Sequence, residues 1–192
     1  MVLISGGGTN LQAILEACAQ GQIAGRVVAV WSNRDGAYGL ERARLAGVAA
    51  EAILLKSFEN RAAFEATLAD RITQAQPDLV VLAGFMHILG PAFLARFPRR
   101  VINLHPALPG AFPGKDAMAQ AFAAWQAGHI THTGVMVHAV VPEVDAGPVL
   151  TTEAVAFEPG DTLERLAARM HVVEHRLLVT TVAQWRPPEE AP

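Results

Sequence analysis

Residues 2–20, VLISGGGTNLQAILEACAQ, decide the fold. A short apolar run leads into three consecutive glycines, after which apolar residues recur at helical spacing. This order predicts a buried strand, a tight turn and an amphipathic helix, the repeating unit of an α/β fold. Thr9 and Gln12 lie three positions apart where the helix begins, and we expect them to form a capping box.

The same alternation continues outward along the first half of the chain. Further strands are expected at residues 27–32, 49–55, 79–84 and 101–105. Helices are expected at residues 39–47 and about 60–76. Continuous apolar runs such as LVVLAG are typical of parallel strands that are buried on both faces. The pattern predicts an α/β, Rossmann-like fold, a mostly parallel twisted sheet with helices on both faces.

The pattern changes after residue 105. Residues 116–128 and 161–185 are expected to be helices, and residues 133–141 and 148–157 are two extended runs joined by the short polar PEVDAG. We therefore expect an antiparallel or mixed C-terminal extension of the sheet. Residues 1–184 are interpreted as one domain with halves of about 1–100 and 101–184, and residues 185–192 as a disordered tail.

The composition is typical of a globular protein with a small-molecule ligand. Apolar residues make up 52% of the chain and charged residues 17%, and the net charge of -3 provides no basic field for nucleic acid. No apolar run reaches the length of a membrane span, and the apolar opening is too short for a signal peptide. Cys18 is the single cysteine and falls on a predicted apolar stripe, so we expect it in the core of a soluble cytoplasmic protein.

The glycine-rich loop at residues 5–10, SGGGTN, follows a strand and opens a helix, where backbone amides can bind a phosphate. The loop lacks the lysine of a Walker A motif, and Leu11 replaces the third glycine of a dinucleotide fingerprint. Ser32 and Asn33 end the second strand where a dinucleotide-binding fold has an acid. Phosphate binding and a simple tight turn both remain possible from these residues.

Asn103 and His105 interrupt the apolar strand VINLH and lie two positions apart, so their side chains share one face. At the carboxyl end of a parallel strand, where such folds place their sites, two neutral donors can stabilise an oxyanion. Asp145 lies in the turn PEVDAG, where an acid often bonds only to its own backbone. If it approaches His105, it can instead fix the tautomer of the imidazole.

The remaining histidines carry weaker signals. His129 and His132 have a spacing that can ligate zinc, but a third ligand is missing nearby in the sequence, and we expect no metal. His171 and Glu174 share a face of the last helix and can line a pocket, although a solvated surface is the interpretation that their positions favour.

An ordered set of motifs runs along nearly the whole chain. It comprises ISGGGTNLQA, SNRDGAYGLERARLAG, VVLAGFMHIL, INLHPALPGAFPG and TGVMVHAVVPEVDAGPV. Together these segments closely resemble the glycinamide ribonucleotide formyltransferases of purine biosynthesis. The resemblance implies the formyltransferase fold and transfer of a formyl group from 10-formyltetrahydrofolate to the primary amine of glycinamide ribonucleotide, without a metal.

The resemblance also implies roles for individual residues. The family's catalytic trio corresponds to Asn103, His105 and Asp145, with the first two stabilising the oxyanion and the third assisting proton transfer. Its phosphate- and ribose-binding positions correspond to Gly8, Thr9, Asn10 and Glu174. Its folate-binding positions correspond to His87, Ile88, Leu89, Val141, Val144 and Gly147. His87 replaces the arginine that the family usually has, which removes a fixed cation near the folate tail.

Other functions also remain possible from the sequence. A formyltetrahydrofolate deformylase and a methionyl-tRNA formyltransferase would each need an additional domain, and the tRNA enzyme also a basic surface. A sugar-nucleotide formyltransferase shares the Asn, His and Asp set but not the SGGGTN turn. A catalytically silent binding module is the alternative outside enzymes. The expected partners are the two small-molecule substrates, with no nucleic acid and no membrane, in a monomer or a homodimer.

Overall fold

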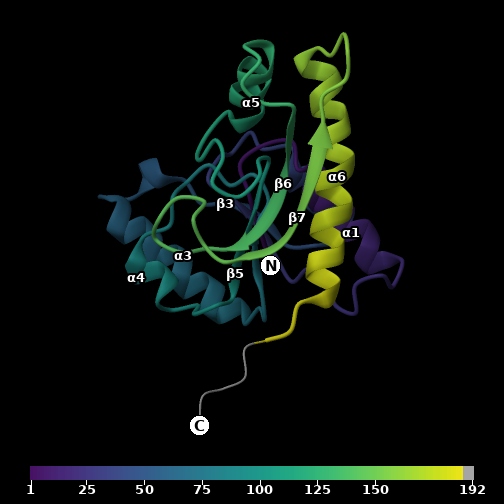
Figure 1. Ribbon diagram of the computed structural model, residues 1–192. Helices are drawn as coiled ribbons and strands as arrows, with labels where there is room; N and C mark the ends of the chain where they lie inside the picture. Colours follow the sequence, from purple (N-terminus) through teal and green to yellow (C-terminus); the bar gives the residue numbers. More distant parts are fainter. Residues whose placement is uncertain (188–192) are drawn as a thin grey trace.

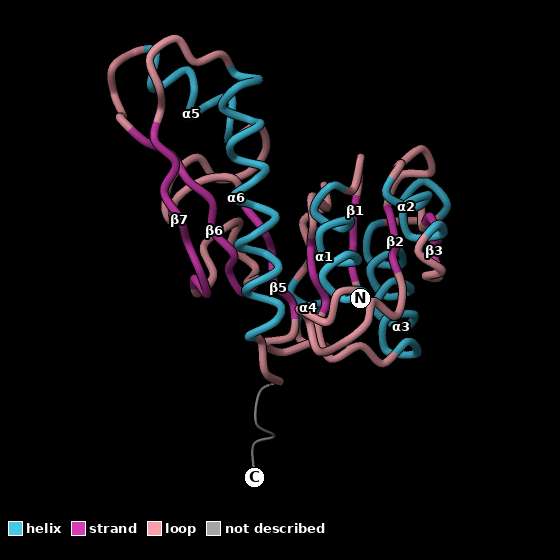
Figure 2. The backbone as a smooth tube through the Cα atoms, turned by 90° about the vertical axis from the view of Figure 1, so that its right-hand side faces the viewer, coloured by secondary structure: helices cyan, strands magenta, loops and turns pink. Residues whose placement is uncertain are grey.

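The computed structural model describes residues 1–187, and the part of the predicted tail at 188–192 lies outside the described residues. Seven strands form its sheet: β1 (Val2–Ile4), β2 (Val30–Ser32), β3 (Ala50–Ala52), β4 (Val80–Leu82), β5 (Val101–His105), β6 (His132–Ala139) and β7 (Val149–Ala156). They are arranged in the order β3-β2-β1-β4-β5-β6-β7, which Figure 2 shows running across the molecule.

The direction of the strands confirms the predicted fold class. The strands from β1 to β5 pair in parallel, whereas β6 is antiparallel to both β5 and β7. The predicted ranges of β2 and β3 were too long, because only three residues of each make ladder pairs. The last two strands form the expected antiparallel extension.

Within residues 1–187, six helices surround the sheet: α1 (Thr9–Ala19), α2 (Gly39–Leu45), α3 (Arg61–Ala75), α4 (Pro91–Leu94), α5 (Ala117–Gln126) and α6 (Leu163–Gln184). A single 3₁₀ turn, η1, spans Leu55–Ser57. The four-residue α4 and the 3₁₀ turn were not predicted, because one helical turn is too short to show a periodic pattern.

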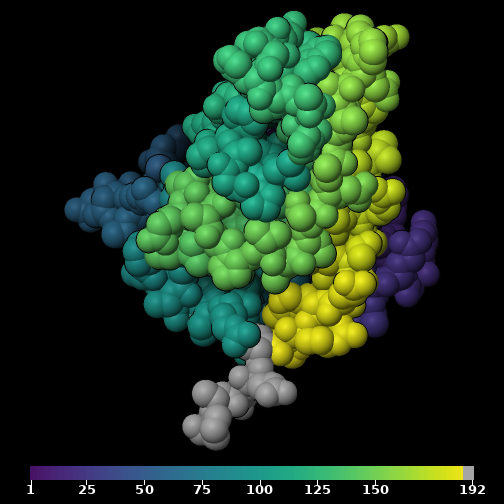
Figure 3. All heavy atoms as spheres, in the orientation of Figure 1, coloured from purple at the N-terminus to yellow at the C-terminus, as the bar shows by residue number. Residues whose placement is uncertain are grey.

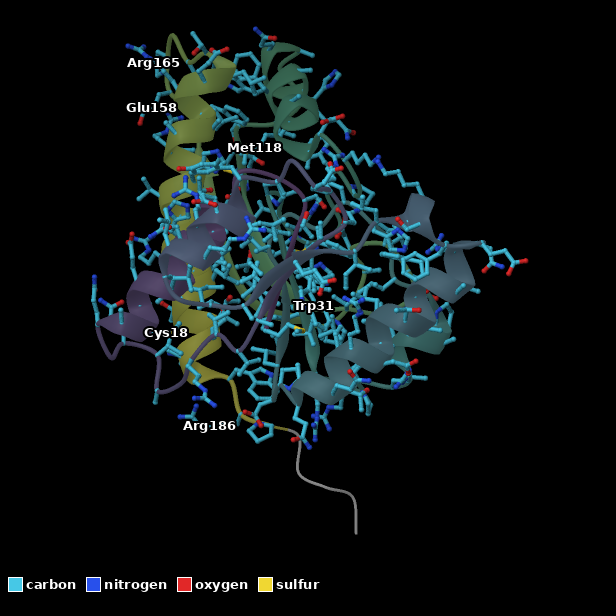
Figure 4. All side chains as sticks on the ribbon, turned by 180° about the vertical axis from the view of Figure 1, so that it is seen from behind. Cys18, Trp31, Met118, Glu158, Arg165 and Arg186 are labelled. Atoms are coloured by element: carbon cyan, nitrogen blue, oxygen red, sulfur yellow. The ribbon has the colours of Figure 1, made fainter. Side chains whose placement is uncertain are left out.

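The helices lie in two layers, one on each face of the sheet (Figure 1). Successive strand residues alternate between them, so Ile4 packs into the core under α1, α2 and α6, and Leu3 into the core under α3 and α4. Cys18 is partly buried against the first of these cores, as expected, and Figure 4 shows it at the end of α1 beside α6. Trp185 packs against the same core.

The expected capping box at the start of α1 is wrong. Gly8 is the N-cap, with a left-handed φ of 72°, and Thr9 is already the first helical residue. No side chain caps the helix, so its first backbone amides remain free of side-chain partners. None of the helices within residues 1–187 is both long and apolar enough to cross a membrane.

The glycine loop packs directly on the start of α2. The Gly39 amide donates a hydrogen bond of 3.1 Å to the Gly6 carbonyl. A Cβ atom at Gly8 would lie 2.6 Å from the Gly39 Cα, and one at Gly39 would lie 2.4 Å from Ile4 Cδ1. Gly8 and Gly39 therefore approach each other too closely for either to carry a side chain, and this contact fixes the loop on α2.

Gly39→Ala should destabilise the protein by about 1–3 kcal/mol, because the added methyl group overpacks this contact. Denaturant unfolding of Gly36→Ala is the matched control, since a Cβ there meets nothing within 4 Å. Equal unfolding free energies for the two variants would show that the loop contact is not tightly packed.

Candidate active site

Asn103 and His105 project together from β5, on the opposite side to Leu104, which packs in the α1 and α6 core. The antiparallel register pairs Asn103 with His138 on β6 and His105 with Met136. His138 is therefore brought beside Asn103 by the pairing of the two strands. His105 and His138 are only 4% and 2% exposed, so their ring nitrogens require protein partners.

Asp145 reaches this strand end from the loop between β6 and β7, where it adopts a left-handed φ of 52°. Its Oδ2 accepts a hydrogen bond of 2.8 Å from the Gly114 amide and lies 3.4 Å from His105 Nδ1. Its Oδ1 accepts a bond of 3.2 Å from Asn103 Nδ2 and lies 3.4 Å from His138 Nε2. One carboxylate thus touches all the polar side chains at the end of β5.

These contacts keep Asp145 ionised. Burial would raise the pKa of the carboxyl, but its contacts with His138, the Gly114 amide and His105 outweigh burial and hold the pKa below its usual value. The strained backbone at Asp145 is thereby compensated by its side-chain bonds.

His105 lies between two acceptors. Its Nε2 is 3.0 Å from the Phe112 carbonyl, and because a carbonyl oxygen only accepts, Nε2 carries a proton. Burial lowers the pKa of His105 below its usual value, although Asp145 and the Phe112 carbonyl act in the opposite direction. The lowered pKa favours the neutral imidazole, with the ionised Asp145 carboxylate beside Nδ1.

His138 orients Asn103. Its Nδ1 donates a bond of 2.9 Å to the Ala139 carbonyl, which in the neutral ring leaves Nε2 as the acceptor for Asn103 Nδ2 at 3.2 Å. Sequence reasoning did not include this histidine in the site. The available signal was a polar residue late in the apolar strand TGVMVHAVV, but the register that places it opposite Asn103 is not visible in the sequence.

A cavity of about 750 Å³ opens in front of these residues. Ten of the predicted site residues line it: Asn10, His87, Ile88, Leu89, Asn103, His105, Val141, Val144, Asp145 and Glu174. Figure 3 shows the loop of residues 141–147, in light green, next to the teal segment that follows β5, in agreement with the contact between Gly114 and Asp145. The two halves of the chain both contribute to the cavity.

Three predicted residues are placed elsewhere. Gly8 packs against Gly39, and Thr9 lies exposed at the first turn of α1. Gly147 is buried with its Cα against Ala139, since a Cβ there would lie 1.8 Å from the Ala139 carbonyl oxygen. Gly147 therefore shapes the loop that carries Asp145 by close backbone packing.

Glu174 lies at the other end of the cavity and is only 3% exposed, so the solvated surface favoured from the sequence is wrong for this residue. Its Oε2 accepts bonds of 3.0 Å from Asn10 Nδ2 and from His171 Nδ1. The Oδ1 of Asn10 is buried without a partner among the described residues. This end of the cavity thus offers an acceptor to a bound molecule, next to the start of α1.

Metal-ligating side chains do not gather here: across residues 1–187, no group of three or more His, Cys, Asp or Glu residues could hold a metal ion. His129 precedes β6 and His132 is its first residue, and both are exposed. The polar groups of the cavity can instead hydrogen-bond an organic molecule and transfer protons within it.

Comparison with known proteins agrees with this geometry. A family model described as formyl transferase matches residues 1–182. The chain belongs to the formyl transferase family.

Relatives of this formyl transferase carry a more specific name. Phosphoribosylglycinamide formyltransferase of Schizosaccharomyces pombe is 44% identical, with 96% of this chain and 95% of the relative covered. The protein of that name from Escherichia coli is 43% identical, over 92% and 82% of the two chains. Its likeness to these relatives confirms the resemblance found in the sequence and identifies this formyl transferase as an enzyme.

Solved structures give the same result. The crystal structure of glycinamide ribonucleotide transformylase 1 from Symbiobacterium toebii superimposes with a TM-score of 0.89 at 46% identity, covering 95% of this chain and 84% of that one. The structure of phosphoribosylglycinamide formyltransferase from Bacillus halodurans has a TM-score of 0.90 at 36% identity, with 95% and 92% covered.

The pair of His171 and Glu174 should make stability depend on pH. The hydrogen bond that His171 donates to Glu174 raises the pKa of His171 in the folded protein, so the stabilisation is complete below the pKa of the unfolded state and is lost as the pH rises through the folded pKa. His171→Gln should therefore lower the urea midpoint more at about pH 5.5 than at about pH 9. His129→Gln, at an exposed histidine, is the control, and an equal loss at both pH values would contradict the pairing.

Proposed function

We propose that this formyl transferase transfers the formyl group of 10-formyltetrahydrofolate to the primary amine of glycinamide ribonucleotide, in purine biosynthesis. The observation that carries the proposal is the contact of one ionised carboxylate, Asp145, with Asn103, His105 and His138 at the centre of the cavity. The names of the relatives support the choice of substrates.

The reaction begins with attack of the amine on the formyl carbon, which places negative charge on the formyl oxygen. We propose that Asn103 and His105 donate hydrogen bonds to this oxyanion, where preorganised donors in a buried site are most effective. The formyl oxygen would replace the Phe112 carbonyl at His105 Nε2. Asn103 Nδ2 would likewise exchange its bond to His138 or Asp145 for one to the oxygen.

Asp145 completes the proton transfer. The attacking amine releases one proton, which Asp145 would receive and pass to the departing folate nitrogen as the tetrahedral intermediate collapses. The same carboxylate lies 3.4 Å from His105 Nδ1 and orients the imidazole whose Nε2 proton bonds the oxyanion. Its pKa below the usual value keeps it ionised and ready to accept.

The two ends of the cavity suit the two substrates. The uncapped backbone amides of Gly8, Thr9 and Asn10 at the start of α1 would bind the phosphate, and Glu174 would accept hydrogen bonds from the ribose hydroxyls. The folate would lie against His87, Ile88 and Leu89 and the loop that carries Val141, Val144 and Gly147. This arrangement uses phosphate binding, far from the reacting amine, to orient the amine.

The deciding experiment is an absorbance assay of 10-formyltetrahydrofolate with and without glycinamide ribonucleotide. Consumption of the formyl-folate only when the amine is present supports the transferase. Consumption without the amine would identify a deformylase, and folate binding without turnover would identify a silent binding module.

His105→Ala should lower kcat by about 10²–10³, because it removes one donor to the oxyanion. The folate and the amine substrate should still bind, which equilibrium titration of each checks. His129→Ala removes an exposed histidine of the same type and should leave kcat unchanged. Full turnover in His105→Ala would contradict the role given to the imidazole.

Glu174→Gln should raise KM for glycinamide ribonucleotide and leave KM for the formyl-folate nearly unchanged, because Glu174 lies at the end of the cavity assigned to the ribose. We expect about a tenfold increase, equivalent to about 1.4 kcal/mol. Steady-state kinetics with each substrate varied in turn gives both constants. A rise confined to the folate KM would reverse the assignment of the two ends.

A further inference from the structure

A buried carboxylate lies behind one wall of the cavity and takes no part in the proposed reaction. Glu65 is on α3, next to the fully buried Phe64, and is 8% exposed. An ionised group in such a position requires hydrogen-bonding partners that replace water. Those partners show what the residue does.

Three donors from two segments surround the carboxylate. Oε1 accepts a bond of 2.7 Å from Arg61 Nε and lies 3.0 Å from His87 Nε2. Oε2 accepts a bond of 2.9 Å from the Gly90 amide. Burial would raise the pKa of Glu65, but the bonds from Arg61, His87 and Gly90 hold it below its usual value, so the carboxylate stays charged.

Gly90 is adapted to this contact. A Cβ at position 90 would lie 2.7 Å from Glu65 Oε2, closer than any stable contact. Its φ of -76° is open to every residue, so position 90 needs a glycine for space and not for backbone conformation. The carboxylate reaches the Gly90 amide only because no side chain stands between them.

Arg61 also holds Ile88, which lies between the two Glu65 partners His87 and Gly90. While its Nε bonds to Glu65, its Nη2 donates to the Ile88 carbonyl. The His87 ring is also held edge-on against Phe64 and Phe85, with centroids 5.0 and 6.1 Å away. Glu65 therefore bonds residues 87 and 90 directly, and it holds residue 88 through Arg61. Residues 87–89 line the cavity.

We propose that Glu65 is a positioning residue for the folate: its buried carboxylate holds the wall segment of residues 87–90 in the shape that binds the co-substrate. The inference rests on the proposed function, in which this wall takes the folate. Glu65 lies behind the wall and outside the residues that line the cavity, so it acts through His87, Ile88 and Gly90 and not by touching the ligand.

The test compares Glu65→Ala and Glu65→Gln with Asp70→Asn. Asp70 lies on the same helix and also pairs with an arginine, Arg96, at 2.6 Å, but it is 62% exposed. Titration with tetrahydrofolate gives the dissociation constant, and steady-state kinetics gives kcat and both KM values. Hydrogen exchange reports the protection of the amides of residues 87–90.

We expect Glu65→Ala to weaken tetrahydrofolate binding about tenfold and to raise the formyl-folate KM similarly, while kcat and the KM for the amine substrate stay within about twofold. Glu65→Gln, which keeps the shape and one acceptor oxygen, should show a smaller effect of the same kind. Both variants should lose exchange protection at residues 87–90, and Asp70→Asn should match the wild type in every measurement.

Gly90→Ala provides a second approach if Glu65→Ala does not fold, because it presses on the carboxylate from the opposite side. It should reproduce the selective loss of folate affinity. Folded variants of Glu65 that bind tetrahydrofolate as the wild type does would overturn the proposal, as would a parallel fall of kcat and both affinities. If the wild type itself binds no folate, the proposed function fails, whereas the exchange data still decide whether Glu65 holds the wall.

Discussion

The site depends on the antiparallel pairing of β6 with β5. Up to β5 the sheet is parallel, and the carboxyl ends of its strands lie along one edge. By running back along β5, the next strand puts His138 directly opposite Asn103. The loop that follows β6 starts beside the amino end of β5, where the Val140 amide donates to the Val101 carbonyl. It folds back along β5, so that Asp145 reaches both β5 side chains.

Much of this arrangement could be predicted from the sequence because the pattern of apolar residues reports burial. The apolar runs located all the parallel strands, and the two-residue period of VINLH correctly placed Asn103 and His105 on one face. The strand limits were less certain, since Ala29 is buried as deeply as a strand residue but lies before the ladder of β2. Burial alone does not distinguish a residue that pairs in the ladder from a buried residue just before it.

The parts of the site that could not be predicted depend on contacts between distant segments. His138 looks like an ordinary strand residue until the register of β6 is known. Glu174 follows Met170 by four positions, on the buried face of α6, but a charged residue is ordinarily expected in solvent, and it is the docking of α6 on α1 that buries it. Glu65 is similar: its partners His87 and Gly90 are 22 and 25 residues away, beyond the reach of any local pattern. Asp145 and Glu174 were assigned their roles through resemblance to a family.

The hydrogen bond between Asn10 and Glu174 joins residues 164 positions apart. During synthesis, the glycine loop and α1 leave the ribosome early, while Glu174 follows only after almost all of the sheet has been made. Domains tend to fold as units as they emerge, and contacts between distant residues form late. The nascent chain can thus assemble the parallel strands first, but its substrate-binding end is completed only when α6 has been translated and has docked on α1.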